Sequence, residues 1–170
     1  MAARIIGVTG HRPNRLSSWA IFRLPGRARR VLARLERAAG ATGAEMRLVS
    51  GLAEGADTIV AREALKRGWT LTALLPKPAS AYERDFASRR ARAAFRRLHR
   101  RADETVVVAR AAEAPASPSG RYRAAGIAMV ERIDALIAVH DRGEPAGPGG
   151  THDVMEIARR RGAPIVEIVV

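Results

Sequence analysis

The chain has 170 residues, no cysteine and a formal net charge of +13. This length suits one domain with a sizeable core over residues 1–170, and the lack of cysteine excludes disulfides and thiolate metal sites. No apolar run is long enough to span a bilayer and the N-terminus lacks a signal-peptide pattern, so we expect a soluble, cytoplasmic protein with no membrane partner.

Short apolar runs alternate with segments of helical spacing along the whole chain. The predicted strands are residues 5–9, 46–50, 70–75, 105–109, 134–140 and 165–170. The helices predicted from apolar spacing are residues 28–39, 58–67, 82–101, 122–132 and 151–161. Because strands and helices alternate and the strands are apolar along their whole length, we predict an α/β fold. Its sheet is doubly wound and mainly parallel, with helices on both faces, and is therefore Rossmann-like.

Two connecting segments carry further predictions. Pro25 is well placed as a first helical residue, so residues 17–24 are expected to be irregular. Residues 111–120 are rich in Ala, Pro and Ser and are predicted to form a flexible loop.

Three glycine-bearing turns follow predicted strands, at residues 10–13, 51–57 and 147–153. In a doubly wound fold the ligand binds beyond the carboxyl ends of the strands, so these turns are expected to share one edge. In the last turn, Gly149 and Gly150 let a ligand approach the backbone closely. Thr151 can cap the helix that follows, whose first free N–H groups attract phosphate. The same residues also suit an ordinary turn with a threonine cap.

The first turn contributes Thr9, Gly10, His11 and Arg12. Arg12 can pair with a phosphate as a planar fork, and His11 can donate a hydrogen bond to the same group. Both are alternatively exposed loop residues.

In the second turn, Gly51 and Gly55 flank Glu54, whose carboxylate suits hydrogen bonds from ribose hydroxyl groups. In an enzyme the same carboxylate could stabilise a ribosyl cation, as carboxylates do in glycoside cleavage. Asp57 begins a helix and can complement its dipole.

Other kinds of site receive less support. His11, His140 and His152 are expected near this edge with Asp141 and Asp153, but no pair has a tight metal-ligand spacing, so we predict no metal and no cofactor. The chain has no P-loop motif, and its first turn lacks the full dinucleotide-binding glycine fingerprint.

The three turns in this order resemble the SLOG superfamily. This Rossmann-like group includes the DNA-processing protein A domain, the Lonely Guy phosphoribohydrolases and nucleotide-sensing domains of TRPM channels. The resemblance implies a site for a nucleotide or nucleotide-derived ligand, with Gly149, Gly150 and Thr151 at the phosphate, and Gly10 and Gly51 lining the pocket. It also implies a possible homodimer.

One departure from the Lonely Guy enzymes bears on activity. Those enzymes carry Pro-Gly-Gly-x-Gly-Thr followed closely by a glutamate pair. The present motif is one residue shorter and has Asp153 where a catalytic glutamate is expected. The first prediction is therefore binding or sensing of a nucleotide. The alternative is a phosphoribohydrolase that cleaves a nucleoside monophosphate, with Glu54 or Asp153 as the catalytic carboxylate.

A further alternative is single-stranded DNA binding by the basic helix predicted over residues 82–101. Arginines spaced three or four apart give it one charged face, formed by Arg89, Arg92, Arg96 and Arg100. Aromatic residues make up only 4% of the chain, which leaves few side chains for base stacking.

Overall fold

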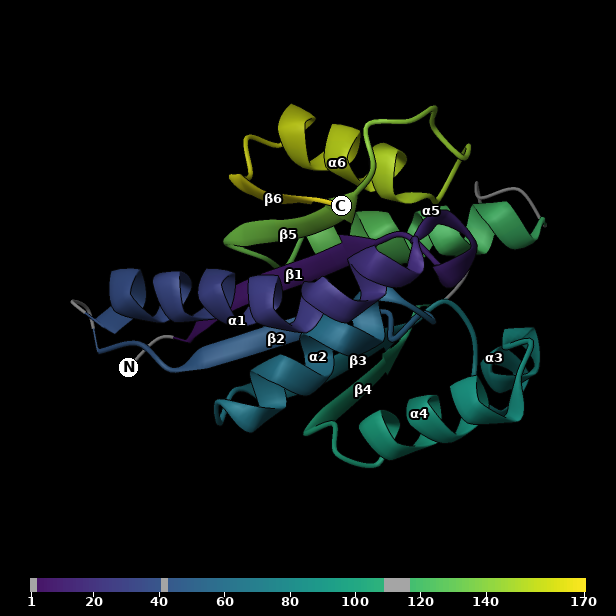
Figure 1. The fold of residues 1–170 in the computed structure, drawn as a ribbon, viewed down its shortest axis with the longest axis horizontal. Coiled ribbons are helices and arrows are strands. Elements are labelled where there is room, and N and C mark those ends of the chain that lie inside the picture. Colours follow the sequence, from purple (N-terminus) through teal and green to yellow (C-terminus); the bar gives the residue numbers. More distant parts are fainter. Residues whose placement is uncertain (1–2, 41–42, 109–116) are drawn as a thin grey trace.

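A computed structural model describes residues 3–40, 43–108 and 117–170 and contains one six-stranded parallel sheet, shown in Figure 1. The strand order is β4–β3–β2–β1–β5–β6. The strands are β1 (Arg4–Gly10), β2 (Met46–Ser50), β3 (Thr70–Leu75), β4 (Glu104–Val107), β5 (Ala135–His140) and β6 (Ile165–Val169). The predicted doubly wound parallel sheet is confirmed.

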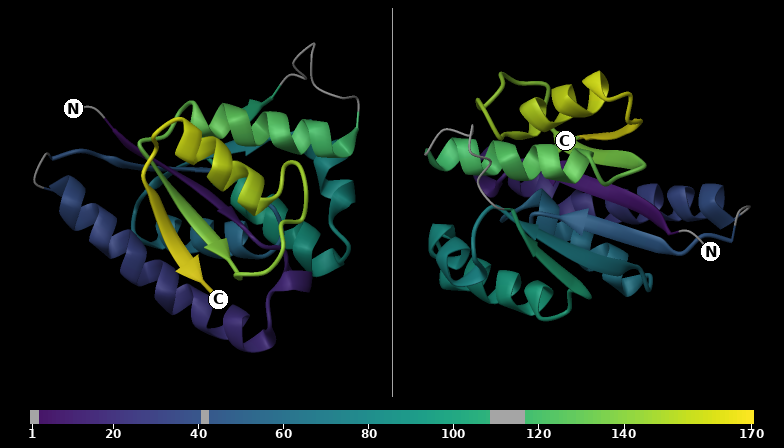
Figure 2. Two further views of the ribbon diagram at one scale, coloured as in Figure 1. Left: turned by 90° about the horizontal axis from the view of Figure 1, so that it is seen from above. Right: turned by 180° about the vertical axis from the view of Figure 1, so that it is seen from behind.

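Helices cover both faces of the sheet. One face carries α1 (Ser18–Gly40), α2 (Ala56–Lys66) and α4 (Arg89–His99), and the other carries α5 (Pro118–Val130) and α6 (Thr151–Arg160). Figure 1 shows α1 in front of the sheet, and the right-hand view in Figure 2, from behind, shows α5 in front of it. Successive residues of a strand serve the two cores: Leu48 packs with the first group of helices and Val49 with the second. This two-sided burial is why the strands are continuously apolar.

The order of the strands creates one switch point. From β1 the chain builds outward through β2 and β3 to β4, then returns through α5 to place β5 on the other side of β1. Thr9 pairs with Ala138 and Gly10 with Val139, so β1 and β5 end side by side. The connections from these two strands therefore leave in opposite directions and open a crevice between them.

The predicted start of the first helix is wrong, because α1 begins at Ser18 and contains Pro25 in its interior. The hydroxyl oxygen of Ser17 accepts a hydrogen bond from the Ala20 N–H at 3.1 Å and caps the helix. Residues spaced four apart continue one buried stripe through the proline, namely Ala20, Leu24, Ala28 and Leu32. Burial of this stripe outweighs the backbone hydrogen bond that Pro25 removes.

The single long helix predicted over residues 82–101 is also wrong. The segment contains the end of α3 (Ala79–Tyr82), a 3-10 turn η2 (Glu83–Asp85), an extended stretch and then α4. Phe86 leaves the helical path to pack against Tyr82 and Phe95, with ring centroids at 5.2 and 5.1 Å. The Ser88 hydroxyl then accepts a hydrogen bond from the Ala91 N–H and starts a new helix.

The remaining differences are at the ends of elements. Helix α5 begins at Pro118, so residues 118–120 of the loop predicted over 111–120 are helical. Ser117 caps this helix, and residues 111–116 lie outside the described residues. Across residues 3–40, 43–108 and 117–170, no helix combines the length and apolarity needed to cross a membrane.

Candidate functional site

A pocket of about 240 Å³ opens at the carboxyl edge of the sheet, beside the switch point. The three glycine turns meet there as predicted, and a 3-10 turn, η1 (Pro13–Arg15), follows the first of them. Nine of the predicted ligand-binding residues line the pocket: Thr9, Gly10, His11, Arg12, Gly51, Asp57, Gly149, Gly150 and Thr151. The apolar part of its wall comes from Val8, Leu74, Ala125, Met129 and Val154.

The first and second turns are held together by backbone contacts. The Ala56 N–H donates to the His11 carbonyl oxygen at 3.2 Å. Gly55, between the turns, has a φ of 105°, and a Cβ at that position would lie 2.7 Å from the same oxygen. Gly55 is buried beneath the site and supports the pocket without lining it.

The N-terminus of α6 faces the pocket through Gly149, Gly150 and Thr151. Gly150 occupies the N-cap position, and no side chain caps the helix there. Within the described part of the chain, the backbone N–H groups of Thr151, His152 and Asp153 have no acceptor, since the first bond into the helix runs from Val154 N–H to the Gly150 carbonyl oxygen. These N–H groups and the helix dipole favour an anion at this end of the pocket.

An arginine and two tyrosines also line the pocket. The Arg12 guanidinium lies 5.4 Å from the centroid of the Tyr122 ring, a cation–π geometry. The Tyr122 hydroxyl donates to Asp85 at 2.6 Å, and Lys77 donates to the same carboxylate at 2.8 Å. Tyr82 lines the pocket beside them. This network places the Arg12 guanidinium at the pocket, and within the described residues no carboxylate lies within salt-bridge distance of it.

His11 is buried, with 4% of its surface exposed, and its Nε2 lies 2.9 Å from Asp141 Oδ1. Arg15 donates to the same oxygen at 2.8 Å. Burial lowers the pKa of His11, with the nearby Arg15 charge acting in the same direction against the Asp141 hydrogen bond. His11 is therefore neutral near pH 7 and shapes the wall of the pocket.

His152 lies between the other two histidines of this edge. Its ring centroid is 5.7 Å from that of His11 and 5.5 Å from that of His140. His140 is in turn bonded to the Asp141 carbonyl oxygen and to Glu167. Among the residues described, no group of three or more histidine, aspartate or glutamate side chains is arranged to hold a metal ion.

The two predicted catalytic carboxylates lie outside the pocket wall. Asp153 Oδ2 accepts a hydrogen bond from the Gly149 N–H at 2.8 Å and pairs with Arg123 Nε at 3.1 Å. Asp153 therefore braces the glycine turn. Glu54 lines a separate shallow hollow on the far side of Arg12.

Sequence reasoning missed several residues of the pocket. These are Asn14, Arg15, Ala53, Pro76, Tyr82 and Tyr122, together with Gly126, Ala146 and the apolar wall. One signal was present in the sequence: the chain has only two tyrosines, and both lie at this pocket.

Proteins of known structure share this fold along nearly the whole chain. DNA processing protein A from Streptococcus pneumoniae matches 99% of this chain with a TM-score of 0.66 and 18% identity, and this chain covers 51% of that protein. DNA processing protein A from Helicobacter pylori, whose structure addresses its single-stranded DNA binding mode, matches 98% of this chain with a TM-score of 0.56 and 15% identity. This chain covers 65% of that protein.

A molybdenum cofactor carrier protein from Chlamydomonas reinhardtii has the same architecture. It matches 97% of this chain with a TM-score of 0.53 and 16% identity, and this chain covers 75% of that protein. No family model matches the chain, and no curated protein matches it. The shared feature is the fold, and the chain spans about half the length of the pneumococcal protein.

Proposed function

We propose that this chain, which has the Rossmann-like fold of the SLOG superfamily, binds a nucleotide or nucleotide-derived small molecule in the pocket at the switch point. The observation that carries the proposal is the uncapped N-terminus of α6, which opens into the same pocket as the Arg12 guanidinium. A phosphate at α6 would accept hydrogen bonds from the free backbone N–H groups. The apolar wall would take the base.

The size of the pocket favours a small ligand. Its volume of about 240 Å³ lies below the range of roughly 300–1,000 Å³ that is usual for drug-sized ligands. A mononucleotide or sugar phosphate suits this volume better than a dinucleotide does. AMP is therefore a suitable first probe.

Arg12→Gln is expected to weaken AMP binding about tenfold to hundredfold. The substitution removes a charge-assisted hydrogen bond donor from the pocket, and such bonds are worth about 1.5–3 kcal/mol. Isothermal titration calorimetry measures the effect directly. Arg4→Gln is the matched control, because Arg4 is an exposed arginine at the start of β1, whose other end leads into the turn that carries Arg12. Equal affinities in wild type and both variants would contradict the assignment of Arg12.

The phosphoribohydrolase alternative has less support in the same pocket. Asp153 is bonded to the Gly149 turn and Glu54 lies in another hollow, so neither carboxylate lines the pocket. Among the residues that line the pocket, the carboxylic acid is Asp57. Analysis of the calorimetry samples for adenine and ribose 5-phosphate tests hydrolysis directly, and release of both would favour the enzyme.

Single-stranded nucleic acid binding is a second candidate function, and one feature of α1 favours it. Two aromatic side chains of this helix are exposed, Trp19 by 61% and Phe22 by 83%. The Arg23 guanidinium lies 4.7 Å from the Trp19 ring centroid. Base stacking on exposed aromatic rings beside cationic groups is typical of single-strand binding.

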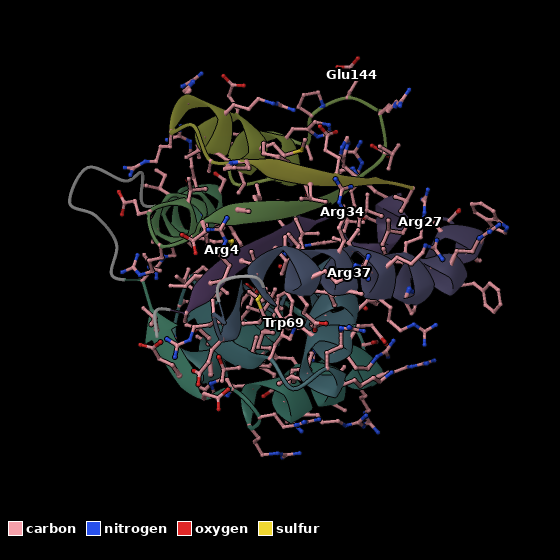
Figure 3. The ribbon with its side chains drawn as sticks, turned by 90° about the vertical axis from the view of Figure 1, so that its left-hand side faces the viewer. Arg4, Arg27, Arg34, Arg37, Trp69 and Glu144 are labelled. Carbon is pink, nitrogen blue, oxygen red and sulfur yellow. The ribbon has the colours of Figure 1, made fainter. Side chains whose placement is uncertain are left out.

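The arginines of α1 continue this surface along the helix. Residues spaced by three, four or seven share one face, and these are Trp19, Arg23, Arg30, Arg34 and Arg37. Arg34 and Arg37, near the C-terminal end of α1, are labelled in Figure 3. Eighteen residues of helix span about 27 Å. By contrast, two arginines of the face predicted on α4 are engaged locally, Arg92 with the Phe86 carbonyl oxygen and Arg96 with Glu83.

Replacing both Trp19 and Phe22 by Ala is expected to weaken binding of an oligothymidylate at least tenfold. Each stacked base is worth about 1–3 kcal/mol, and the remaining binding should fall steeply with salt. Fluorescence anisotropy at two salt concentrations measures both effects. Replacing Arg89 and Arg100 of the α4 segment by Ala is the comparison. A loss in that variant alone would move the surface from α1 to α4.

A further inference from the structure

The most unusual group in the pocket is the buried carboxyl group of Asp57. The residue is 6% exposed and lies in the first turn of α2. It lines the pocket, yet within the described residues its Oδ1 atom has no hydrogen-bond partner. A buried polar atom without a partner costs roughly 1–3 kcal/mol, so one left at a pocket wall indicates a missing partner.

The surroundings of Asp57 indicate what kind of partner is missing. The nearby backbone N–H groups of Ala53 and Gly10 and the Arg12 charge all act to lower the pKa of the carboxyl group. Tyr82, from α3, is the other titratable group beside it, and burial raises the pKa of that phenol, which stays protonated at neutral pH. Every one of these neighbours suits an ionised acceptor. The missing partner is therefore a hydrogen-bond donor.

A glycine without a side chain lies beside the carboxyl group. A Cβ at Gly51 would lie 3.6 Å from Asp57 Oδ2 and 3.7 Å from the Leu74 carbonyl oxygen. Glycine at this position leaves the approach from the pocket free. The structural alternative is that Asp57 only ties the turn before α2 to the end of β1.

Asp57 and the anion-binding end of the pocket follow different strands at the carboxyl edge of the sheet. Helix α2 follows β2 and α6 follows β5, and these strands flank β1 on opposite sides. Two strand spacings amount to about 10 Å. A ligand whose phosphate lies at α6 therefore reaches Asp57 with its sugar or its base.

We propose that Asp57 is the hydrogen-bond acceptor that selects the ligand of this pocket, and that the ligand presents an O–H or N–H donor to it. This inference rests on the proposed nucleotide site and names the chemistry of the ligand at its non-phosphate end. A ribose hydroxyl and a base amino group both supply such a donor. The substitution Asp57→Asn keeps the size of the side chain and one carbonyl acceptor, but it replaces the other carboxyl oxygen by an NH₂ donor.

The test is a calorimetric comparison of three probes with wild type and Asp57→Asn. The probes are AMP, 2′-deoxy-AMP, which lacks the 2′-hydroxyl, and purine riboside 5′-monophosphate, which lacks the amino group. In wild type, we expect one of the two deletions to weaken binding about tenfold to hundredfold, whereas in Asp57→Asn the same deletion changes affinity less than twofold. The deletion that matters identifies the source of the donor.

Proton linkage gives a second readout that needs no variant. Burial raises the pKa of Asp57 to about 7, against the opposing effects of the Ala53 and Gly10 N–H groups and Arg12. A donor ligand binds the ionised form, so AMP affinity should fall about tenfold per pH unit below pH 7. Protons should be released on binding at pH 6. The phosphate of AMP also titrates near pH 6. The pH dependence of AMP affinity in Asp57→Asn measures the effect of the phosphate alone.

The outcomes separate this inference from the proposed function. If no probe binds wild type, the nucleotide site itself fails. If the probes bind but Asp57→Asn has the wild-type selectivity and pH profile, Asp57 is structural and the inference is overturned. An affinity that rises as the pH falls below 7 in wild type alone would also overturn it, because the carboxyl group would then donate. Asp134→Asn, at the opposite edge of the sheet, controls for the loss of one charge.

Discussion

Gly150→Asp is expected to abolish AMP binding, with a loss of at least about hundredfold in affinity. Gly150 is the N-cap residue of α6 and lines the pocket. An aspartate at an N-cap accepts hydrogen bonds from the free N–H groups of the helix and places a negative charge where the phosphate would bind. The phosphate of AMP then loses its hydrogen bonds from the helix N–H groups and the attraction of the helix dipole. Calorimetry with AMP measures the loss.

The backbone at Gly150 accommodates this substitution. Its φ is −80°, which any residue adopts, and a Cβ would lie 3.1 Å from the Gly147 carbonyl oxygen, a tight contact. Gly150→Asn is the matched control, because asparagine has the same shape and caps helices equally well but is neutral. Gly150→Asn should bind AMP more tightly than Gly150→Asp. Undiminished binding by the aspartate variant would show that the phosphate does not lie at α6.

Gly10→Ala is expected to destabilise the fold by about 3 kcal/mol or more, as overpacking of a close contact does. A Cβ at Gly10 would lie 2.3 Å from Ala56 Cβ and 2.9 Å from Val139 Cβ, so α2 or β5 must move. Such a loss lowers the thermal midpoint by roughly 10 °C in a chain of this size. Urea unfolding measures the change in the free energy of unfolding.

Two further variants test the physical reason for this effect. Gly40→Ala should not destabilise, because no atom of the described residues lies within 4 Å of a Cβ at that position. Adding Ala56→Gly to Gly10→Ala removes the closest of the clashing atoms and should recover part of the lost stability. If Gly10→Ala had the same free energy of unfolding as wild type, the end of β1 and the start of α2 would not be in close contact.

Local sequence patterns predicted the glycine turns of the pocket but not its two tyrosines. A glycine turn after an apolar strand is visible in the sequence, and three such turns share an edge in any doubly wound fold. Tyr82 and Tyr122 reach the pocket from helices that no local motif connects to it. Tyr82 comes from α3 and Tyr122 from α5, so the position of each depends on contacts between distant parts of the chain.

The wrong helix boundaries have the same kind of cause. Pro25 is a strong local signal for a helix start, but burial of Leu24 and Ala28 on the sheet continues the helix through it. Phe86 has no breaker beside it, yet packing against Tyr82 and Phe95 ends the helical path there. Propensity is worth tenths of a kcal/mol per residue, and burial of a large apolar side chain about 1.5–3 kcal/mol, so packing decides.

The amino-acid sequence by itself determined the class of the fold, the positions of the six strands and the three glycine turns, because strand periodicity and turn chemistry are local properties. Only the tertiary structure decided which polar groups became buried and which kept partners. Asp153 was bonded into the Gly149 turn, His11 was paired with Asp141, and Asp57 was left at the pocket wall with an oxygen unpartnered among the described residues. The His11–Asp141 contact joins residues 130 apart in the sequence, and the Arg123–Asp153 pair joins residues 30 apart, so no local pattern encodes these contacts.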